Sequence, residues 1–256
     1  MQKSIRIHIV RSLKMCMRML IFEVSMRKLF HYFSRTDLLL WSASVLCIVI
    51  SFAVFDRTGY LTLAASLIGV TSLIFSAKGN AIGQLLMILF SLLYGIISYT
   101  FSYYGEMITY LGMTMPMAVV ALISWLKNPY KGNRAEVKVN RIGRGEQALM
   151  WGITLLVTVL FYFVLDHFGT NHVFPSTLSV TTSFVAAYLT FRRSPYFALA
   201  YAANDVILIV LWVLAGLEEA RYLAVVVCFG AFLFNDLYGF MRWREMGKRQ
   251  GDRGLQ

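Results

Sequence analysis

Charged residues are scarce in this sequence. Asp, Glu, Lys and Arg make up 14% of its 256 residues, against about a quarter in a typical soluble domain. Hydrophobic residues reach 58% and the mean hydropathy is +0.64. This excludes a soluble globular fold and indicates a polytopic membrane protein. The formal net charge is +11, but the basic residues cluster between apolar runs, so they indicate membrane orientation rather than nucleic-acid binding.

Cysteine and histidine are also sparse, with three Cys and four His in the whole chain. They are Cys16, Cys47, Cys228, His8, His31, His167 and His172. No pair has the C-x-x-C or H-E-x-x-H spacing of a redox or zinc site. We therefore expect no disulfide framework, no metal and no cofactor. Since no motif of an enzyme is present either, we expect a protein that is not an enzyme.

Eight apolar runs dominate the chain after a basic N-terminal arm at 1–35. Each is close to the roughly 20 residues that cross a bilayer as a helix. The runs lie at 38–55, 59–77, 80–101, 107–126, 147–165, 176–191, 196–216 and 220–241. They lack the apolar and polar alternation of barrel strands. The arm contains no span: it is either an amphipathic cytoplasmic segment or the product of a misassigned start, with Met26 as the true one.

The basic residues predict the orientation of these spans. With the N-terminus in the cytoplasm, 22 of the 24 Lys and Arg residues fall on the cytoplasmic side, and only Arg57 and Arg221 lie opposite. The loop at 127–146 and the tail at 242–256 are then cytoplasmic as well. The positive-inside rule therefore predicts a multi-pass protein of the bacterial plasma (inner) membrane with both termini in the cytoplasm.

A weak internal repeat organises the spans. Residues 62–76 align with 177–191 at an offset of 115, and Tyr104, Gly112 and Trp125 align with Tyr222, Gly230 and Trp243 at an offset of 118. The two repeats, 59–126 and 176–241, hold three helices each. An odd number in parallel orientation requires a linker helix, which the run at 147–165 supplies, and the helix at 38–55 lies outside the repeat. Parallel repeats around a central site are a transporter architecture.

Acidic residues inside the apolar runs mark the candidate site. Asn204 and Asp205 interrupt an apolar stretch, and the same dipeptide recurs as Asn235 and Asp236. Because a carboxylate in a bilayer is costly, an intramembrane acid is a functional-site hypothesis by default. Asp236 lies closer to the polar end of its helix, where it could reach cytoplasmic water or pair with an arginine at 192 or 193.

Aromatic residues accompany these acids. A carboxylate beside aromatic faces suits a flat, cationic or heteroaromatic solute. The candidate substrate-binding residues are Gln84, Tyr94, Thr181, Tyr201, Asn204, Asp205, Trp212, Asn235 and Asp236. Most hydroxyl groups in the spans are explained equally well as contacts between helices. Trp41, Trp125 and Trp243 fall near helix ends and are interpreted as an interfacial belt.

Several short motifs occur in a fixed order along the chain. They are Ser91-Leu92-Leu93-Tyr94, residues 183–189 followed by Arg192 and Arg193, Asp205 between Arg193 and Gly216, and residues 239–243. In this order, and on this repeat topology, the sequence resembles the PnuC family of vitamin transporters, whose best-known members take up nicotinamide riboside. The resemblance covers roughly residues 38–243.

The resemblance implies an all-α membrane protein of eight transmembrane helices. Two parallel three-helix repeats would be joined by a linker in a SWEET-like 3+1+3 arrangement, with one extra N-terminal helix, often in a homotrimer. It further implies facilitated uptake driven by phosphorylation of the vitamin inside the cell. Tyr201, Asp205 and Trp212 match positions that line the family's pocket. Gln84, Ser176 and the Asn235-Asp236 pair depart from the family pattern, which leaves thiamine, riboflavin and deoxynucleosides open as substrates.

Two further hypotheses assign the chain to other functional classes of membrane protein. In a secondary active transporter, Asp205 and Asp236 would carry protons. A membrane scaffold would transport nothing. For the leading hypothesis the expected partners are a small vitamin or nucleoside, the lipid bilayer and further copies of the chain, with no nucleic acid.

Overall fold

The computed structural model describes residues 32–100, 104–170 and 172–252. Nearly all of the predicted arm at 1–35 lies outside these ranges. Contacts divide the chain into two units, residues 1–40 and 41–256. In the first unit, a reciprocal capping box begins the first described long helix: the Ser34 N–H donates to Asp37 Oδ2 (2.7 Å), and the Asp37 N–H donates to Ser34 Oγ (3.2 Å).

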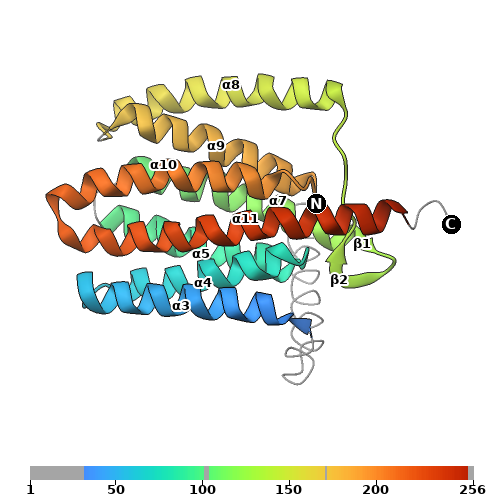
Figure 1. The fold of residues 1–256 in the computed structure, drawn as a ribbon. Helices are drawn as coiled ribbons and strands as arrows, with labels where there is room; N and C mark the ends of the chain where they lie inside the picture. The colour runs from blue at the N-terminus through green and yellow to red at the C-terminus, as the bar shows by residue number, and fades with distance from the viewer. Residues whose placement is uncertain (1–31, 101–103, 171, 253–256) are drawn as a thin grey trace, which may run out of the picture. The chain divides into compact units, whose positions relative to one another are not determined.

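Helices account for nearly all of the described structure (Figure 1). The elements are α3 (Arg35–Phe55), α4 (Tyr60–Ala77), α5 (Ile82–Thr100), α6 (Tyr104–Ile108), the π-helix η1 (Thr109–Thr114), α7 (Met115–Lys127), β1 (Pro129–Tyr130), β2 (Asn133–Val137), α8 (Arg144–His167), α9 (Val173–Phe191), α10 (Phe197–Glu218), the 3₁₀-helix η2 (Ala220–Tyr222) and α11 (Leu223–Asp252). Each of the eight predicted runs coincides with a helix, so the all-α fold class is confirmed.

Seven helical segments in the described ranges are long and apolar enough to span a membrane, and α9 is not among them. Seven of the 19 residues of α9 are Ser or Thr. Their hydroxyls donate back to carbonyls one turn earlier, as Thr177, Thr181 and Thr190 do at 2.7–2.8 Å. Packing against α7, α8 and α10 further shields α9 from lipid. A polar helix is tolerated here because protein surrounds it.

Six helices form a closed ring in which each packs against the next: α4, α5, α7, α9, α10, α11 and back to α4. The first three belong to one repeat and the last three to the other. The linker α8 packs on α9 outside the ring (Figure 1). The extra helix α3 contacts the ring through Trp41, whose Nε1–H donates to Thr71 Oγ1 at 3.2 Å.

The two repeats share a helix-ending motif that corrects the predicted offset. Gly79 follows α4 at φ +68°, and the next amide, Asn80 N–H, donates to Phe75 O (3.1 Å). At the end of α9, residue 193 has φ +57°, and the Ser194 N–H donates to Leu189 O (3.0 Å). Both are Schellman motifs. They superpose at an offset of 114 residues, one fewer than the apolar alignment predicted.

Trp125 and Trp243 do not form an interfacial belt, so that interpretation was wrong. Their relative exposures are 2% and 0%. Trp125 Nε1–H donates to Thr190 O and Trp243 Nε1–H to Ser76 O, both at 2.8 Å. Each indole, on the third helix of one repeat, therefore binds the end of the first helix of the other repeat. Buried indoles need such a partner for the N–H.

The loop after α7 and the tail of α11 pack together. β1 and β2 form an antiparallel hairpin, and Val137 N–H donates to Gly79 O at 2.9 Å. α11 continues well past the predicted end at 241 because Met246 is buried there and Gln250 Oε1 accepts from Val139 N–H at 2.8 Å. Most of the predicted tail is therefore helix docked on the hairpin.

A π-helix interrupts the last helix of the first repeat. η1 directly precedes the turn containing Pro116. Proline lacks an N–H and its ring crowds the carbonyl four residues earlier, so the regular hydrogen-bond ladder cannot continue through it. The wider turn also sets the direction of Tyr110, which is buried in the ring.

Candidate functional site

Two acids face each other inside the ring. Asp205 on α10 and Asp236 on α11 are 3% and 4% exposed, and their carboxyl groups are close enough to share a hydrogen bond. No Lys or Arg forms an ion pair with either acid in the described part of the chain. Two adjacent carboxylates in a medium of low dielectric repel each other unless a proton or a cation lies with them.

The arginines proposed as partners of Asp236 have other partners. Arg192 donates to both carboxylate oxygens of Glu146, at the start of α8. This hydrogen-bonded pairing raises the pKa of the Arg192 guanidinium. Arg193 donates to Lys138 O and to Ser124 Oγ, at 3.1 and 3.0 Å. The alternative in which Asp236 pairs with one of them is therefore wrong, because both side chains, just after α9, bind partners on α7, on α8 and in the loop between those two helices.

Polar groups from three elements lie near Asp205. Its carboxylate lies within electrostatic range of the Tyr110 and Tyr201 hydroxyls and of the Cys228 thiol. In the part of the chain that the structure describes, Asp205 Oδ2 accepts no hydrogen bond from a protein donor. Buried polar atoms in native proteins are nearly always paired. A buried carboxylate oxygen in this state favours a proton or a ligand as its partner.

Asn204 faces the first helix of its own repeat. Its Oδ1 accepts from Thr182 Oγ1 at 2.9 Å and from Ser179 Oγ at 3.2 Å. The two hydroxyls are three residues apart and so share one face of α9. They fix the orientation of the amide beside Asp205.

An aromatic cluster adjoins this polar region. Tyr94 and Trp212, from different repeats, are both buried, with ring centroids 6.3 Å apart and planes at 90°. Tyr94 also meets Tyr110 at 4.5 Å, and that second ring is near Asp205. Phe90, Phe229 and Phe232 complete the cluster. The aromatic cluster thus approaches the carboxyl groups through Tyr110. The assignment of Tyr94, Trp212 and Asp205 to substrate binding stays a prediction.

Three predicted site residues point elsewhere. Asn235 Nδ2 donates to Ser44 Oγ on α3 at 2.8 Å, and Thr181 Oγ1 lies 2.8 Å from Thr158 Oγ1 on α8. Gln84 Nε2 donates to Ser76 Oγ at 3.4 Å, and it precedes Tyr94 by a helical distance of about 15 Å. Neighbouring residues on a helix point about 100° apart. Asp236 and Thr182 therefore face the interior while Asn235 and Thr181 face the outer helices.

Sequence reasoning did not select four residues that the fold brings here: Tyr110, Ser179, Thr182 and Cys228. The three-residue spacing of Ser179 and Thr182 is a signal that could have been used. The sequence gives no such signal for Tyr110 and Cys228. The direction of the Tyr110 side chain depends on the π-helix, and that of Cys228 depends on the packing of α11. Among the residues that the structure describes, no group of three His, Cys, Asp or Glu is placed to hold a metal ion.

Comparison with known proteins places these features in a family. A family model described as nicotinamide mononucleotide transporter matches residues 59–245. The nicotinamide riboside transporter PnuC of Neisseria mucosa is 26% identical over 200 residues, covering 77% of this chain and 76% of that protein. The PnuC of Haemophilus influenzae is 22% identical over 192 residues, covering 74% of this chain and 81% of that protein. A crystal structure of the vitamin B3 transporter PnuC has a similar fold, with a TM-score of 0.74 at 24% identity, over 85% of this chain and 94% of that one.

Proposed function

The chain belongs to the nicotinamide mononucleotide transporter family and is a multi-pass membrane transporter, and we propose that it takes up nicotinamide riboside. The two curated relatives carry that substrate in their names. The substrate is the riboside of a pyridinium ring, so it combines a flat aromatic cation with polar hydroxyl and amide groups.

The contact between Asp205 and Asp236 is the observation that supports this substrate most strongly. A pyridinium cation would relieve the repulsion between two adjacent carboxylates. The rings of Tyr94, Tyr110 and Trp212 offer faces and edges for a flat cation. The amide of Asn204, oriented by Thr182 and Ser179, supplies a polar contact for the ribose or the carboxamide.

Transport is proposed to be facilitated diffusion, with the riboside trapped by phosphorylation inside the cell. Both chain ends lie in the cytoplasm of a bacterium, and the protein resides in its plasma membrane. The concentration of Lys and Arg in the loop at 127–146, just after α9 and in the last turns of α11 supports this orientation. The chain assembles as a homo-oligomer, a trimer by family resemblance, for which the exposed apolar residues of α3 and α8 offer surface.

Uptake into proteoliposomes tests the proposal. Vesicles that contain the purified protein and radiolabelled nicotinamide riboside outside should fill to equal concentration on both sides. Enclosing a nicotinamide riboside kinase with ATP should then raise the retained label severalfold. Transport of thiamine or riboflavin in place of nicotinamide riboside would refute the substrate. Accumulation above equal concentration without the kinase would refute facilitated diffusion.

A second candidate mechanism is favoured by the same carboxyl pair. Asp205 and Asp236 have no cationic partner in the described residues, so a proton is the alternative species that allows their contact. Substrate and proton would then exchange at one site. An imposed pH gradient, without kinase, should change the final ratio of inside to outside substrate, and an unchanged ratio rules the coupling out.

A further inference from the structure

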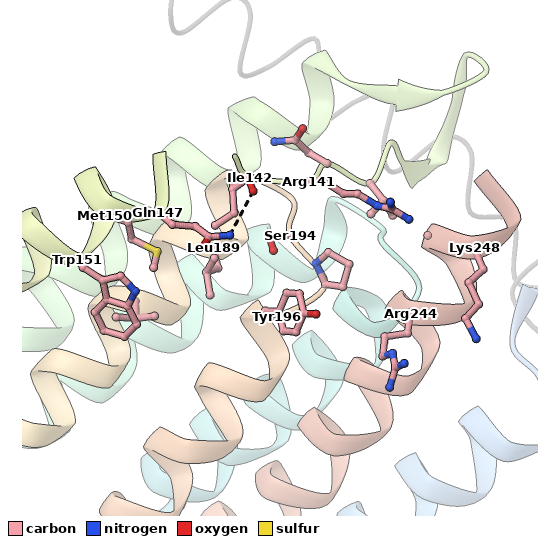
Figure 2. A pocket seen from close by; sticks show the side chains of 15 residues that line it. Arg141, Ile142, Gln147, Met150, Trp151, Leu189, Ser194, Tyr196, Arg244 and Lys248 are labelled. Atoms are coloured by element: carbon pink, nitrogen blue, oxygen red, sulfur yellow. Dashed lines mark hydrogen bonds between the residues drawn. The ribbon is translucent and has the colours of Figure 1, made fainter. Parts of the chain in front are cut away.

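A cavity lies away from the central acids, at the end of the bundle where α9 finishes. Its volume is about 680 Å³. It is bordered by the loop at 139–142, the start of α8, the connector at 194–196 and the last turns of α11 (Figure 2). None of its lining residues belongs to the cluster around Asp205, so the cavity is a separate site.

Uncompensated positive charge distinguishes this cavity. Arg141, Arg244 and Lys248 line it, and no Asp or Glu does. None of the three forms an ion pair in the part of the chain that the structure describes. Figure 2 shows Arg244 and Lys248 on α11 and Arg141 on the loop opposite. Three cations from two segments around one hollow favour an anion with several acceptor oxygens, such as a phosphate group.

Neighbouring bases differ in this respect. Arg249 pairs with Glu136, and Arg242 with Glu245 at 3.1 Å. Arg192 pairs with Glu146, which lies in the first turn of α8, the helix that borders the cavity. Three bases at this end of the bundle therefore have acidic partners, while the three that line the cavity do not.

The remaining lining is partly polar and partly apolar. Ser194 and Tyr196 add hydroxyl groups, and the positive end of α8 lies between Ile142 and Gln147. The opposite wall contains the buried side chain of Met150 and that of Trp151, which begins an apolar surface. Trp151 is 58% exposed, and the exposed face continues along α8 through Leu155. The cavity thus joins a basic region to the membrane-facing side of a transmembrane helix.

We propose that this cavity binds a phosphate ester, and that its occupant is the head group of an anionic membrane lipid. Arg141, Arg244 and Lys248 hold the phosphate, while Met150 and Trp151 pack against the glycerol and the first acyl carbons. Basic pockets between helices on the cytoplasmic side are suited to such head groups, and Trp is enriched at this depth. A soluble phosphate monoester also offers phosphate oxygens to the three bases but would leave the apolar wall unused.

The test is binding by the purified full chain, with two probes. In one arm, nanodiscs of phosphatidylcholine with a minor fraction of phosphatidylglycerol are analysed by native mass spectrometry for retained phosphatidylglycerol. In the other, glycerol 3-phosphate is added to protein in pure phosphatidylcholine, and its binding is measured calorimetrically. The variant is Arg244→Gln with Lys248→Gln. Its matched control, Lys131→Asn with Lys138→Gln, removes two charges from the neighbouring loop outside the cavity.

The parent and the control should retain phosphatidylglycerol selectively, and the variant should lose roughly 30-fold in lipid affinity. Arg141→Gln, on an exposed loop, should lose affinity in the same direction, which keeps the proposal testable if the double variant does not fold. Binding of glycerol 3-phosphate, but not of the lipid, overturns the lipid as occupant. Equal lipid retention by parent, variant and control overturns the site. Neither outcome depends on transport, so failure here is distinct from failure of the proposed substrate.

Discussion

The indole rings of Trp125 and Trp243 meet with their centroids 5.3 Å apart, and each N–H binds a carbonyl at the end of the other repeat's first helix. The two side chains close the ring of six helices at one end. The contact joins the repeats symmetrically, so both tryptophans carry equivalent roles.

Replacing either tryptophan by phenylalanine should therefore destabilise the protein to a similar degree. Each change removes one of the two hydrogen bonds that its carbonyl accepts, because Thr190 O also accepts from a backbone N–H at 3.0 Å and Ser76 O from another at 2.9 Å. The cost of the lost bond is about 0.5–1.5 kcal/mol. We expect Trp125→Phe and Trp243→Phe to lower the melting temperature in detergent by comparable amounts. Trp151→Phe, on an exposed position of α8, is the control and should change little. A large loss in only one of the two buried variants would contradict the symmetric role.

Variants of Thr182 and Thr181 allow a comparison between a side chain that faces the interior of the ring and a neighbour that faces the outer helix α8. Thr182→Val removes a donor to Asn204 Oδ1, whereas Thr181→Val removes the contact with Thr158. Valine keeps the shape of threonine, so stability should change by about 1 kcal/mol or less in each case. The first variant should raise the KM for nicotinamide riboside severalfold and the second should not. Equal KM values would remove Asn204 from the binding site.

Asn235 should contribute to stability rather than to binding. Its Nδ2 donates to Ser44 Oγ on α3 and to Ala231 O, both at 2.8 Å. A double-mutant cycle of Asn235→Ala and Ser44→Ala should give a coupling of about 1 kcal/mol in unfolding free energy. The affinity for substrate should be unchanged in both variants. A loss of affinity in Asn235→Ala that Ser44→Ala does not share would return Asn235 to the substrate site.

Gly79 should not tolerate a side chain. It ends α4 at φ +68°, and a Cβ there would lie 3.1 Å from the end of Met246. The left-handed conformation alone costs a residue with a Cβ about 1–2 kcal/mol. We expect Gly79→Ala to lower the melting temperature by several degrees. Gly132→Ala serves as a control for left-handed backbone without crowding, because no atom lies within 4 Å of its Cβ position, and it should lose less.

The sequence predicted the helices well and their faces poorly. Apolar length located all eight helices because a span must satisfy its own backbone hydrogen bonds, which leaves little alternative to helix. The cost of burying an acid located Asp205. The sequence identity between the apolar helices was too weak to determine the offset between the two repeats to within one residue. The structure gives the offset through the left-handed residues that follow α4 and α9. Whether Asn235 or Asp236 faces inward depends on helix rotation, which hydropathy does not determine when the outer neighbour is another helix.

The incorrect prediction that Trp125 and Trp243 lie at the membrane interface has the same physical cause. A tryptophan near a helix end fits a membrane interface and a buried helix crossing equally well by composition. Only the position of the other repeat, brought alongside by the ring, decides between them. The assignment of Gln84, Tyr201 and the remaining predicted site residues to substrate stays a prediction.

We propose that the paired carboxyl groups of Asp205 and Asp236 recognise the positive charge of the substrate. Calorimetric binding of nicotinamide riboside and of its reduced, uncharged dihydropyridine form tests it most directly, because the two ligands differ little in size. The parent protein should bind the cation at least about 10-fold more tightly, as expected for a charged contact worth roughly 1.5 kcal/mol or more. Asp205→Asn should lose most of that preference. Equal binding of the two forms by the parent would contradict the account.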